Sequence, residues 1–255
     1  MKSRALVKIP SSRFACGLTT KSLGRPDPHQ VAVQHRRYVE ALQRTGLEVL
    51  VLEPDEHPDS CFVEDLALIL DSRVVLTRPR HPARAAEQQA IRDALAEALP
   101  NFPLVEIEAP GYLEGGDVLR MGDRWFVGCS HRTNDQGFEQ LAAILLEDGQ
   151  RCFQVKVPDV LHLKTGVTAV GRDTVLALPP LVESFRKFGL RVVEVSEAES
   201  HAVNVVAVGS RIVMPSGYPG VRQAVAALGL EPQEVELSEF QKQDGGATCL
   251  SILLP

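Results

Sequence analysis

The chain has 255 residues, 44% of them hydrophobic, which is enough for one large α/β core or two small ones. Its 33 acidic and 27 basic residues give a formal charge of −6, so it lacks the concentrated positive charge that neutralises phosphates, and we expect no nucleic-acid partner. No apolar stretch reaches the roughly 18 residues of a membrane span, and the first residues do not resemble a secretory signal. We therefore expect a cytoplasmic protein that does not enter a membrane.

A unit of two short strands, a helix and a third strand recurs along the chain. The first copy has a strand at 3–10, a helix from Pro28 to the residue before Gly46, and a strand at 47–54. Each predicted helix has apolar residues three or four positions apart and closes on Gly or Pro. The other copies, each opened by one further strand, are predicted at 62–70, 71–79, 91–99 and 104–110; at 115–121, 122–130, 138–145 and 152–159; at 165–171, 171–179, 182–188 and 190–197; and at 202–209, 209–217, 221–228 and 233–239.

The first copy lacks an opening strand, and the last stretch of the chain, 246–254 ("GATCLSILL"), can supply it. Pairing of this stretch with residues 3–10 would close five units into a ring and remove two exposed sheet edges. We therefore predict a single α/β domain over residues 1–255 with pseudo-five-fold symmetry. The segments that join one unit to the next are then equivalent and should meet at the axis. Their sequences are "DSCFVED", "GYLEGGD", "DVLHLKTG", "ESHAVN" and "QDGGATC".

Three of these junctions carry residues suited to covalent catalysis. Cys249 could act as a nucleophile, His162 as its general acid and base, and Glu114 as the carboxylate that orients the imidazole. The alternative is that Cys249 is a small buried hydrophobic residue and His162 a core histidine with its hydrogen bonds satisfied. The equivalent positions of the two residues favour the catalytic interpretation. Four further cysteines are read as packing residues: Cys16, Cys61, Cys129 and Cys152.

Charged residues near the same junctions could bind a substrate. The carboxylates Asp59, Glu64 and Asp65 would be costly to bury together unless a cation such as a guanidinium neutralised them. Arg84 and Arg132 stand at helix entries of two units and could bind a carboxylate through paired N–H groups. A solvated acidic turn and ordinary surface arginines are the alternatives.

No metal or cofactor site is predicted. The histidines form no HxxxH or HExxH motif, the cysteines form no CxxC, and neither a GxGxxG nor a GxxxxGK phosphate loop occurs. We therefore expect chemistry performed by side chains alone, with no cofactor.

In its motifs the sequence resembles the dimethylarginine dimethylaminohydrolase family of the guanidine-modifying superfamily, which includes arginine deiminase and the amidinotransferases. The resemblance spans nearly the whole chain. It rests on "GLTT", "LGRPD", "PDSCFVED", "IEAPGYLEGGD", "RTN", "LHLKTG", "MPSGYP" and "DGGATC", in the family's order. It implies a five-bladed α/β propeller, the pentein fold, which agrees with the repeat found above.

The resemblance also implies roles for individual residues. Cys249 would be the nucleophile, His162 the general acid and base, and Glu114 its partner. For the substrate, Asp65 would hold the guanidinium with support from Asp59 and Glu64, Arg84 and Arg132 would bind the α-carboxylate, Leu18 would lie on a loop covering the substrate, and the backbone near Gln243 would meet the α-amino group. The sequence departs from the family's pattern around Arg84 and Gln243.

Lys164 distinguishes between substrates within the superfamily. Arginine deiminases and amidinotransferases typically carry an acidic residue two positions after the histidine, whereas this chain has lysine, as the dimethylarginine hydrolases do. A second carboxylate could not be satisfied by methylated nitrogens, because methylation removes N–H donors. The resemblance therefore implies hydrolysis of Nω,Nω-dimethyl-L-arginine and Nω-monomethyl-L-arginine to L-citrulline and dimethylamine or methylamine, through a thiouronium adduct on Cys249.

Other functions stay open at this point. The chain could hydrolyse arginine or citrulline, or bind an arginine analogue without catalysis, although a binding protein needs no nucleophile. A papain-like protease would place its cysteine at the start of a helix and well before its histidine, unlike Cys249. A small-molecule substrate is the expected partner, and a homodimer is neither required nor excluded by the sequence.

The resting state of Cys249 is predicted from the nearby acidic residues. Asp59, Glu64, Asp65 and Glu114 should raise the pKa of the thiol by like-charge repulsion, so the empty site should hold a neutral thiol at pH 7. A bound guanidinium should reverse this effect and favour the thiolate. A standing ion pair between Cys249 and protonated His162 is the alternative.

Overall fold

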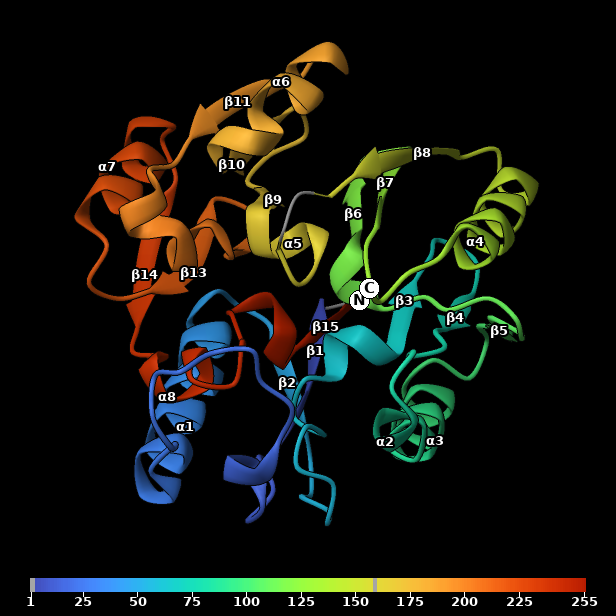
Figure 1. Cartoon of the computed structure of the whole chain (residues 1–255), viewed down its shortest axis with the longest axis horizontal. Coiled ribbons are helices and arrows are strands. Elements are labelled where there is room, and N and C mark those ends of the chain that lie inside the picture. The colour runs from blue at the N-terminus through green and yellow to red at the C-terminus, as the bar shows by residue number, and fades with distance from the viewer. Residues whose placement is uncertain (1–2, 158–159) are drawn as a thin grey trace.

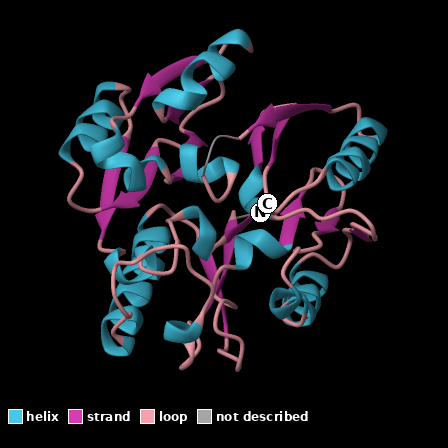
Figure 2. Ribbon diagram, in the orientation of Figure 1, coloured by secondary structure: helices cyan, strands magenta, loops and turns pink. Residues whose placement is uncertain are grey.

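The computed structural model describes residues 3–157 and 160–255. Within them lie five three-stranded sheets arranged as a ring, with helices toward the outside and strands toward the middle (Figures 1 and 2). In every sheet one neighbour of the middle strand is antiparallel and the other, reached through a helix, is parallel. This is the predicted propeller of five repeated units.

The first sheet joins the two ends of the chain. Its middle strand β1 (Arg4–Lys8) pairs in parallel with β2 (Glu48–Leu52) and antiparallel with β15 (Ile252–Leu254). The register places Arg4 opposite Leu254, so the last strand closes the ring on the first. Helix α1 (Pro28–Arg44) connects β1 to β2. Asp27 caps its N-terminus, because the Asp27 side chain accepts a hydrogen bond from Gln30 N.

The other four blades repeat this arrangement. Their helices mostly end at glycines with positive φ, for example Gly149 after α4 and Gly229 after α7, a backbone conformation that other residues adopt at a cost. The elements of the four blades are β3 (Ala67–Ile69), β4 (Val74–Leu76), α2 (Pro82–Ala85), α3 (Gln88–Ala98) and β5 (Leu104–Glu106); β6 (Val118–Met121), β7 (Arg124–Cys129), α4 (Asp135–Glu147) and β8 (Arg151–Lys156); α5 (Leu163–Gly166), β9 (Val167–Ala169), β10 (Thr174–Ala177), α6 (Pro179–Lys187) and β11 (Arg191–Glu194); and β12 (Val206–Val208), β13 (Arg211–Pro215), α7 (Pro219–Ala227) and β14 (Glu231–Val235). A short helix, α8 (Ser238–Gln241), follows β14.

The inner strands are shorter than predicted, because a turn of helix precedes each of the five. These turns are η2 (Val63–Leu66), η3 (Gly115–Asp117), α5, η4 (Glu197–Val203) and η5 (Thr248–Leu250). Cys249 therefore lies in η5 rather than in the closing strand. At the axis, side-chain carboxylates take the place of neighbouring strands as hydrogen-bond acceptors for backbone N–H groups. Asp65 Oδ1 accepts a hydrogen bond from Gly116 N, and Asp117 Oδ1 accepts one from Leu163 N. The last two positions of the strand predicted at 152–159 lie outside the described residues.

The hydrophobic core consists of five clusters, each at the boundary between neighbouring blades. In one of them Leu6 and Ile252 from the first sheet pack with Ile91 and Leu95 of α3 from the second blade. In another, Phe126 of β7 packs with Phe185 of α6 from the next blade, their ring centroids 5.3 Å apart. Because each cluster contains residues of two blades, the packing stabilises the ring as a whole. The polar junctions lie at its centre. No helix in 3–157 or 160–255 is both long and apolar enough to cross a membrane.

Candidate active site

The junctions between blades surround a small pocket of about 30 Å³ near the axis. The predicted site residues from four junctions and two loops come together here. The lining residues are Leu18, Asp59, Phe62, Asp65, Arg84, Glu114, Leu161, His162, Arg132, Gln243, Asp244, Gly245 and Cys249. Of the residues singled out from sequence, only Glu64 and Lys164 are missing from this lining.

Cys249 is held in η5 with its sulfur accepting a hydrogen bond from Gly246 N at 3.3 Å. The segment before it can approach other segments of the chain closely because it contains Gly245 and Gly246: a Cβ on Gly246 would lie 2.5 Å from the Asn204 side chain. Burial raises the pKa of the Cys249 thiol to about 12, and the negative charges of Glu64 and Asp65 add to the increase. The direction matches the sequence prediction, whereas burial rather than like charge is the main cause.

His162 and Glu114 form the hydrogen-bonded pair expected of an acid/base and its orienting carboxylate. His162 Nε2 lies 2.8 Å from Glu114 Oε2, and both side chains are buried. Burial alone lowers the pKa of His162, but the charge of Asp65 and the hydrogen bond to Glu114 outweigh it and raise the pKa to about 9. The imidazole is therefore cationic at neutral pH and can donate a proton.

Gly116 provides the space for this pair, because a Cβ there would lie 2.8 Å from the His162 ring. Its backbone N–H donates to Asp65 Oδ1 at 3.0 Å, and the same oxygen lies 3.9 Å from His162 Nε2. Burial alone raises the pKa of Asp65, but the charges of His162 and Arg84 outweigh it and hold the pKa below its usual value. Asp65 is therefore a buried carboxylate facing the same pocket as Cys249.

Arg84 is placed differently from the expectation of a free carboxylate-binding residue. Its guanidinium is buried and already paired: Nη1 donates to Asp65 Oδ2 at 3.0 Å, Nε to Glu87 Oε2 at 2.6 Å, and Nη2 to Phe62 O at 2.8 Å. Burial raises the pKa of Glu87 to about 7 in spite of the charge of Arg84. Three partners, two of them from the junction at 59–65 and one just after α2, make Arg84 an internal counter-ion that fixes Asp65.

Arg132 has more freedom. Its side chain is about one-fifth exposed, and Nη1 lies 3.4 Å from Glu114 Oε1, at the limit of a hydrogen bond. The residue stands just before α4, where Thr133 Oγ1 donates to Asp117 Oδ2. Of the two predicted arginines, Arg132 has more N–H donors left for a ligand, because its guanidinium makes one hydrogen bond and that of Arg84 makes three.

Leu18 and Asp59 meet at the rim of the pocket. Leu18 N lies 3.1 Å from both Asp59 carboxylate oxygens, and burial raises the pKa of Asp59 despite this hydrogen bond. Two residues further on, Thr20 N donates to Asp244 at 2.6 Å. Asp244 has a positive φ of 60°, which is unusual for a residue with a side chain. The segment of Leu18 is thus held across the pocket by two carboxylates.

Gln243 precedes Asp244 and is buried, and its side-chain Oε1 has no hydrogen-bond partner among the described residues. Its backbone N–H is already used, because it donates to Phe240 O at 2.9 Å. An unpaired buried carbonyl oxygen facing a pocket is an acceptor for a ligand's N–H group.

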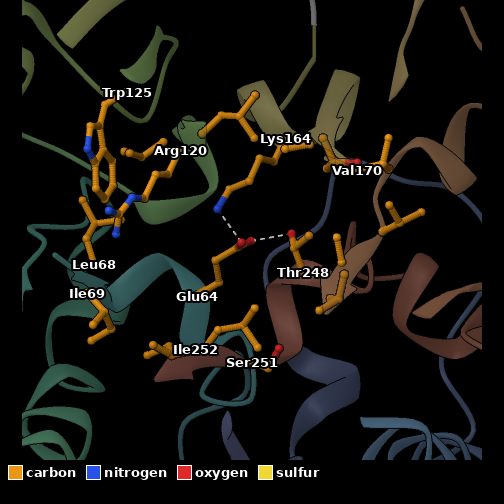
Figure 3. A pocket seen from close by; sticks show the side chains of 18 of the residues that line it. Glu64, Leu68, Ile69, Arg120, Trp125, Lys164, Val170, Thr248, Ser251 and Ile252 are labelled. Carbon is orange, nitrogen blue, oxygen red and sulfur yellow. Dashed lines mark hydrogen bonds and ion pairs between the residues drawn. The ribbon is translucent and has the colours of Figure 1, made fainter. Parts of the chain in front are cut away.

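Glu64 faces away from the pocket, toward a separate cavity of about 470 Å³ that is lined by the inner strands (Figure 3). Its carboxylate forms an ion pair with Lys164 Nζ and accepts a hydrogen bond from Thr248 Oγ1 at 2.7 Å (Figure 3). Glu64 therefore lines this separate cavity and not the pocket that Cys249 borders. The structure does not place it beside a guanidinium in the pocket. Lys164 is paired with Glu64 rather than pointing to solvent.

Among residues 3–157 and 160–255, one group of side chains is close enough to hold a metal ion: Asp65, Glu114 and His162 offer atoms within 4.8 Å of one another. The pKa of His162, raised to about 9, works against this use because a protonated imidazole cannot be a ligand. Two carboxylates and a cationic imidazole are better suited to an organic cation and proton transfer.

Comparison with known proteins identifies the family. The family model for arginine deiminase matches residues 53–208. The N(G),N(G)-dimethylarginine dimethylaminohydrolase of Pseudomonas aeruginosa is 37% identical over 253 residues, 99% of each chain, and that of Streptomyces coelicolor is 40% identical over 98% of this chain and 96% of its own. This chain belongs to the dimethylarginine dimethylaminohydrolase family. A solved structure of the Pseudomonas aeruginosa enzyme, a C249S mutant complexed with citrulline, superposes with a TM-score of 0.96 at 36% identity and full coverage of both chains.

The dimethylarginine dimethylaminohydrolase site contains residues that the sequence analysis did not single out. Asp117 accepts hydrogen bonds from Ser130, Thr133 and Leu163 N and so connects the segments of Arg132 and His162. Glu87 completes the burial of Arg84. Asp117 could have been predicted as a site residue from the sequence, because it directly follows "GG" in a junction. Glu87 lies outside the junctions, and no sequence pattern pointed to it.

Proposed function

We propose that the chain hydrolyses Nω-methylated L-arginines to L-citrulline, releasing dimethylamine from the Nω,Nω-dimethyl form and methylamine from the monomethyl form. The observation that carries the proposal is the hydrogen-bonded pair of His162 and Glu114 in the pocket that also holds Cys249. Family membership at 37–40% identity over nearly the full length supports the same activity.

The guanidinium is proposed to lie between Asp65 and Glu114. Both carboxylates are buried, and a guanidinium supplies planar pairs of N–H donors that match them. A substituted nitrogen has fewer donors, so its methyl groups need a place without a carboxylate. Lys164 supports this assignment. It stands where arginine deiminases typically have an acidic residue, and its ammonium group is paired with Glu64.

The first half of the reaction replaces the amine with sulfur. The Cys249 thiol loses its proton to solvent, and the thiolate attacks the guanidinium carbon. A C–S bond forms while the π electrons of the C=N bond move onto nitrogen, which gives a tetrahedral adduct. His162 gives a ring proton to the substituted nitrogen, and the C–N bond to that nitrogen then breaks. Dimethylamine or methylamine departs, and a thiouronium adduct remains on Cys249.

The second half adds water. His162, now neutral, takes a proton from a water molecule whose oxygen attacks the same carbon. The C–S bond breaks, and the new C–O bond becomes the ureido carbonyl of citrulline. The hydroxyl proton lost in this step passes to the departing Cys249 thiolate, which restores the thiol. The protonated His162 is thereby restored, and no electron donor or acceptor is needed.

Binding of the amino-acid end is proposed for the rim. Arg132 has free N–H groups for the α-carboxylate, while Gln243 offers its unpaired oxygen and Asp59 its carboxylate to the α-amino group. Arg84 is proposed to support Asp65 through the ion pair at 3.0 Å rather than to bind the carboxylate by itself. Because the pocket measures about 30 Å³, the segment of Leu18 has to move for a substrate to enter.

Protonation of the empty site agrees with this scheme. The pKa of Cys249 is raised to about 12 by burial and that of His162 to about 9, so the resting pair at neutral pH is a thiol and an imidazolium. The proton donor for the leaving amine is thus in place before the substrate arrives. The positive charge of the bound guanidinium is proposed to favour the thiolate only when there is a carbon to attack.

The test is incubation with dimethylarginine, monomethylarginine, arginine and citrulline, followed by mass spectrometry of the products. We expect citrulline and the matching amine from the two methylated substrates. Equal or faster release of ammonia from unmethylated arginine would identify an arginine deiminase instead, and the absence of any turnover would identify a binding protein. We also propose that residues 1–255 act as one catalytic domain, because Cys249 and His162 come from different blades of one closed ring.

A further inference from the structure

Asn204 lies at the one junction for which the proposed function names no residue. The other four junctions supply Asp65, Glu114, His162 and Cys249 to the pocket. Asn204 follows η4 and precedes β12, so it stands at the equivalent place in the remaining junction, and it is buried. It also lines a cavity of about 240 Å³ that Cys249 borders as well.

The side-chain amide of Asn204 joins the two segments that carry the nucleophile and the acid/base. Its Oδ1 accepts from Thr248 N at 2.7 Å, one residue before Cys249. Its Nδ2 donates to Lys164 O at 2.9 Å, two residues after His162. The remaining Nδ2 hydrogen goes to Thr248 Oγ1 at 3.0 Å. Both donors and one acceptor position of the amide are therefore used within the two catalytic segments.

These hydrogen bonds fix the direction of the next one. Because Thr248 Oγ1 accepts from Asn204, its own hydrogen is free to point at Glu64, and Thr248 Oγ1 donates to Glu64 Oε2 at 2.7 Å. The other oxygen of Glu64 is held by Lys164 Nζ (Figure 3). A closed loop of contacts thus runs from Asn204 through Thr248 and Glu64 to Lys164 and back to Asn204.

The Asn204 side chain also packs against the turn that contacts the sulfur. A Cβ on Gly246 would lie 2.5 Å from Asn204 Cγ and Oδ1, so the amide lies close against the Gly246 backbone, in space that a side chain would fill. The N–H of Gly246 is the group that donates to Cys249 Sγ. Movement of the Asn204 side chain would therefore change the backbone of the segment that leads into Cys249, at Gly246 and at Thr248.

We infer that Asn204 is a positioning residue that sets the distance and direction of Cys249 Sγ relative to His162 through the backbone of Thr248 and of Lys164. The inference rests on the proposed function, because it presupposes that Cys249 and His162 act on the same carbon. Attack geometry is demanding, and a displacement of about 1 Å between reacting groups can lower a rate about 100-fold. No contact of Asn204 with the substrate is required.

The experiment compares four variants of the full chain. Asn204→Ala removes all three hydrogen bonds. Asn204→Asp keeps the shape and the acceptor for Thr248 N, but it removes both donors and adds a negative charge near Glu64 and Cys249. Thr248→Val removes only the hydroxyl. Gln150→Ala is the matched control, because Gln150 is another buried amide with two side-chain hydrogen bonds, to Trp125 and Asp71, far from the pocket.

Each variant is measured for kcat, KM, melting temperature and the pH dependence of alkylation of Cys249 by iodoacetamide, read on the Cys249 peptide by mass spectrometry. For Asn204→Ala we expect kcat to fall about 100-fold with KM changed less than about threefold, because Asp65 and Arg132 are untouched. Thr248→Val should fall less. In Asn204→Asp the alkylation profile should move to higher pH, because a new negative charge disfavours the thiolate. Gln150→Ala should lower the melting temperature and leave kcat and the profile unchanged.

The inference is overturned if the Asn204 variants lower only the melting temperature, as Gln150→Ala does, and keep wild-type kcat and alkylation profiles. Alkylation needs no substrate, so it separates this inference from the proposed function. If wild-type protein turns over no methylated arginine but the alkylation profile of Asn204→Ala, which adds no charge, still differs from that of the wild type, the proposed function fails while the positioning of Cys249 by Asn204 stands. Asn204→Asp keeps the size of the side chain and so provides the measurement if Asn204→Ala does not fold.

Discussion

Replacing Glu114 with Gln removes the negative charge beside His162 and leaves the shape of the site unchanged. In the wild type the charge of Asp65 and the hydrogen bond to Glu114 raise the pKa of His162 from 6.5 to about 9 in spite of burial. At pH 8 a group with a pKa of about 9 is about 90% protonated, whereas a group at its ordinary 6.5 is about 3% protonated. The protonated fraction can therefore fall by up to about 30-fold, and the remaining charge of Asp65 makes the real loss smaller.

The assay is the pH dependence of kcat with dimethylarginine for the wild type and Glu114→Gln. Protonated His162 is needed for departure of the amine, so we expect the alkaline limb of the profile to move to lower pH in the variant. The difference between the two enzymes should be small at pH 6 and largest near pH 8. An alkaline limb that stays in place, with kcat reduced equally at every pH, would refute the assignment of His162 as the proton donor whose pKa Glu114 supports.

Four further predictions concern the charges of the site. Arg84→Ala should lower the free energy of unfolding by about 3–5 kcal/mol in urea titrations, because Asp65 and Glu87 lose their buried counter-ion; a raised KM with full stability would instead make Arg84 a substrate ligand. Arg132→Ala should weaken binding of methylarginine much more than of methylguanidine, which lacks the carboxylate, and equal losses in calorimetry would argue for a structural role. Treatment with a chelator should leave activity unchanged, because protonated His162 is no metal ligand, and activity restored only by added metal would contradict this. The stabilisation from protonated His162 should be complete below pH 6.5 and be lost as the pH rises through about 9, so His162→Asn should flatten the unfolding free energy over that interval.

Much of the fold could be predicted because the repeat is local in sequence. Apolar residues at helical spacing mark the amphipathic helices such as α1 and α4, and the missing opening strand of the first unit pointed to closure by β15. The turns before the inner strands were read as strand because residues 62–70 and 246–254 are apolar and β-branched enough for either. Hydrogen bonding between neighbouring strands ends at these turns because tertiary contacts at the axis replace it, such as the hydrogen bond from Gly116 N to Asp65. Such contacts are not visible in local sequence patterns.

The site was predictable to the extent that topology alone gathers residues. Equivalent junctions placed Cys249, His162 and Glu114 together in advance of any distance. The directions of the side chains were not predictable. Glu64 and Asp65 are adjacent, yet Glu64 faces the separate cavity lined by the inner strands and Asp65 faces the pocket. Neighbouring residues on a tight turn point to different sides, and the choice depends on partners such as Lys164 and Arg84 that are distant in sequence.

The most direct test of the account is the identity of the residue that becomes covalently attached to substrate carbon. Wild-type protein is mixed with saturating dimethylarginine, quenched in acid during turnover, digested and mapped by mass spectrometry, with Cys249→Ser as the blank. The account predicts a thiouronium adduct on the Cys249 peptide, formed together with dimethylamine, and no adduct or turnover in the variant. An adduct on Cys16, Cys61, Cys129 or Cys152, or substantial turnover by Cys249→Ser, would contradict it.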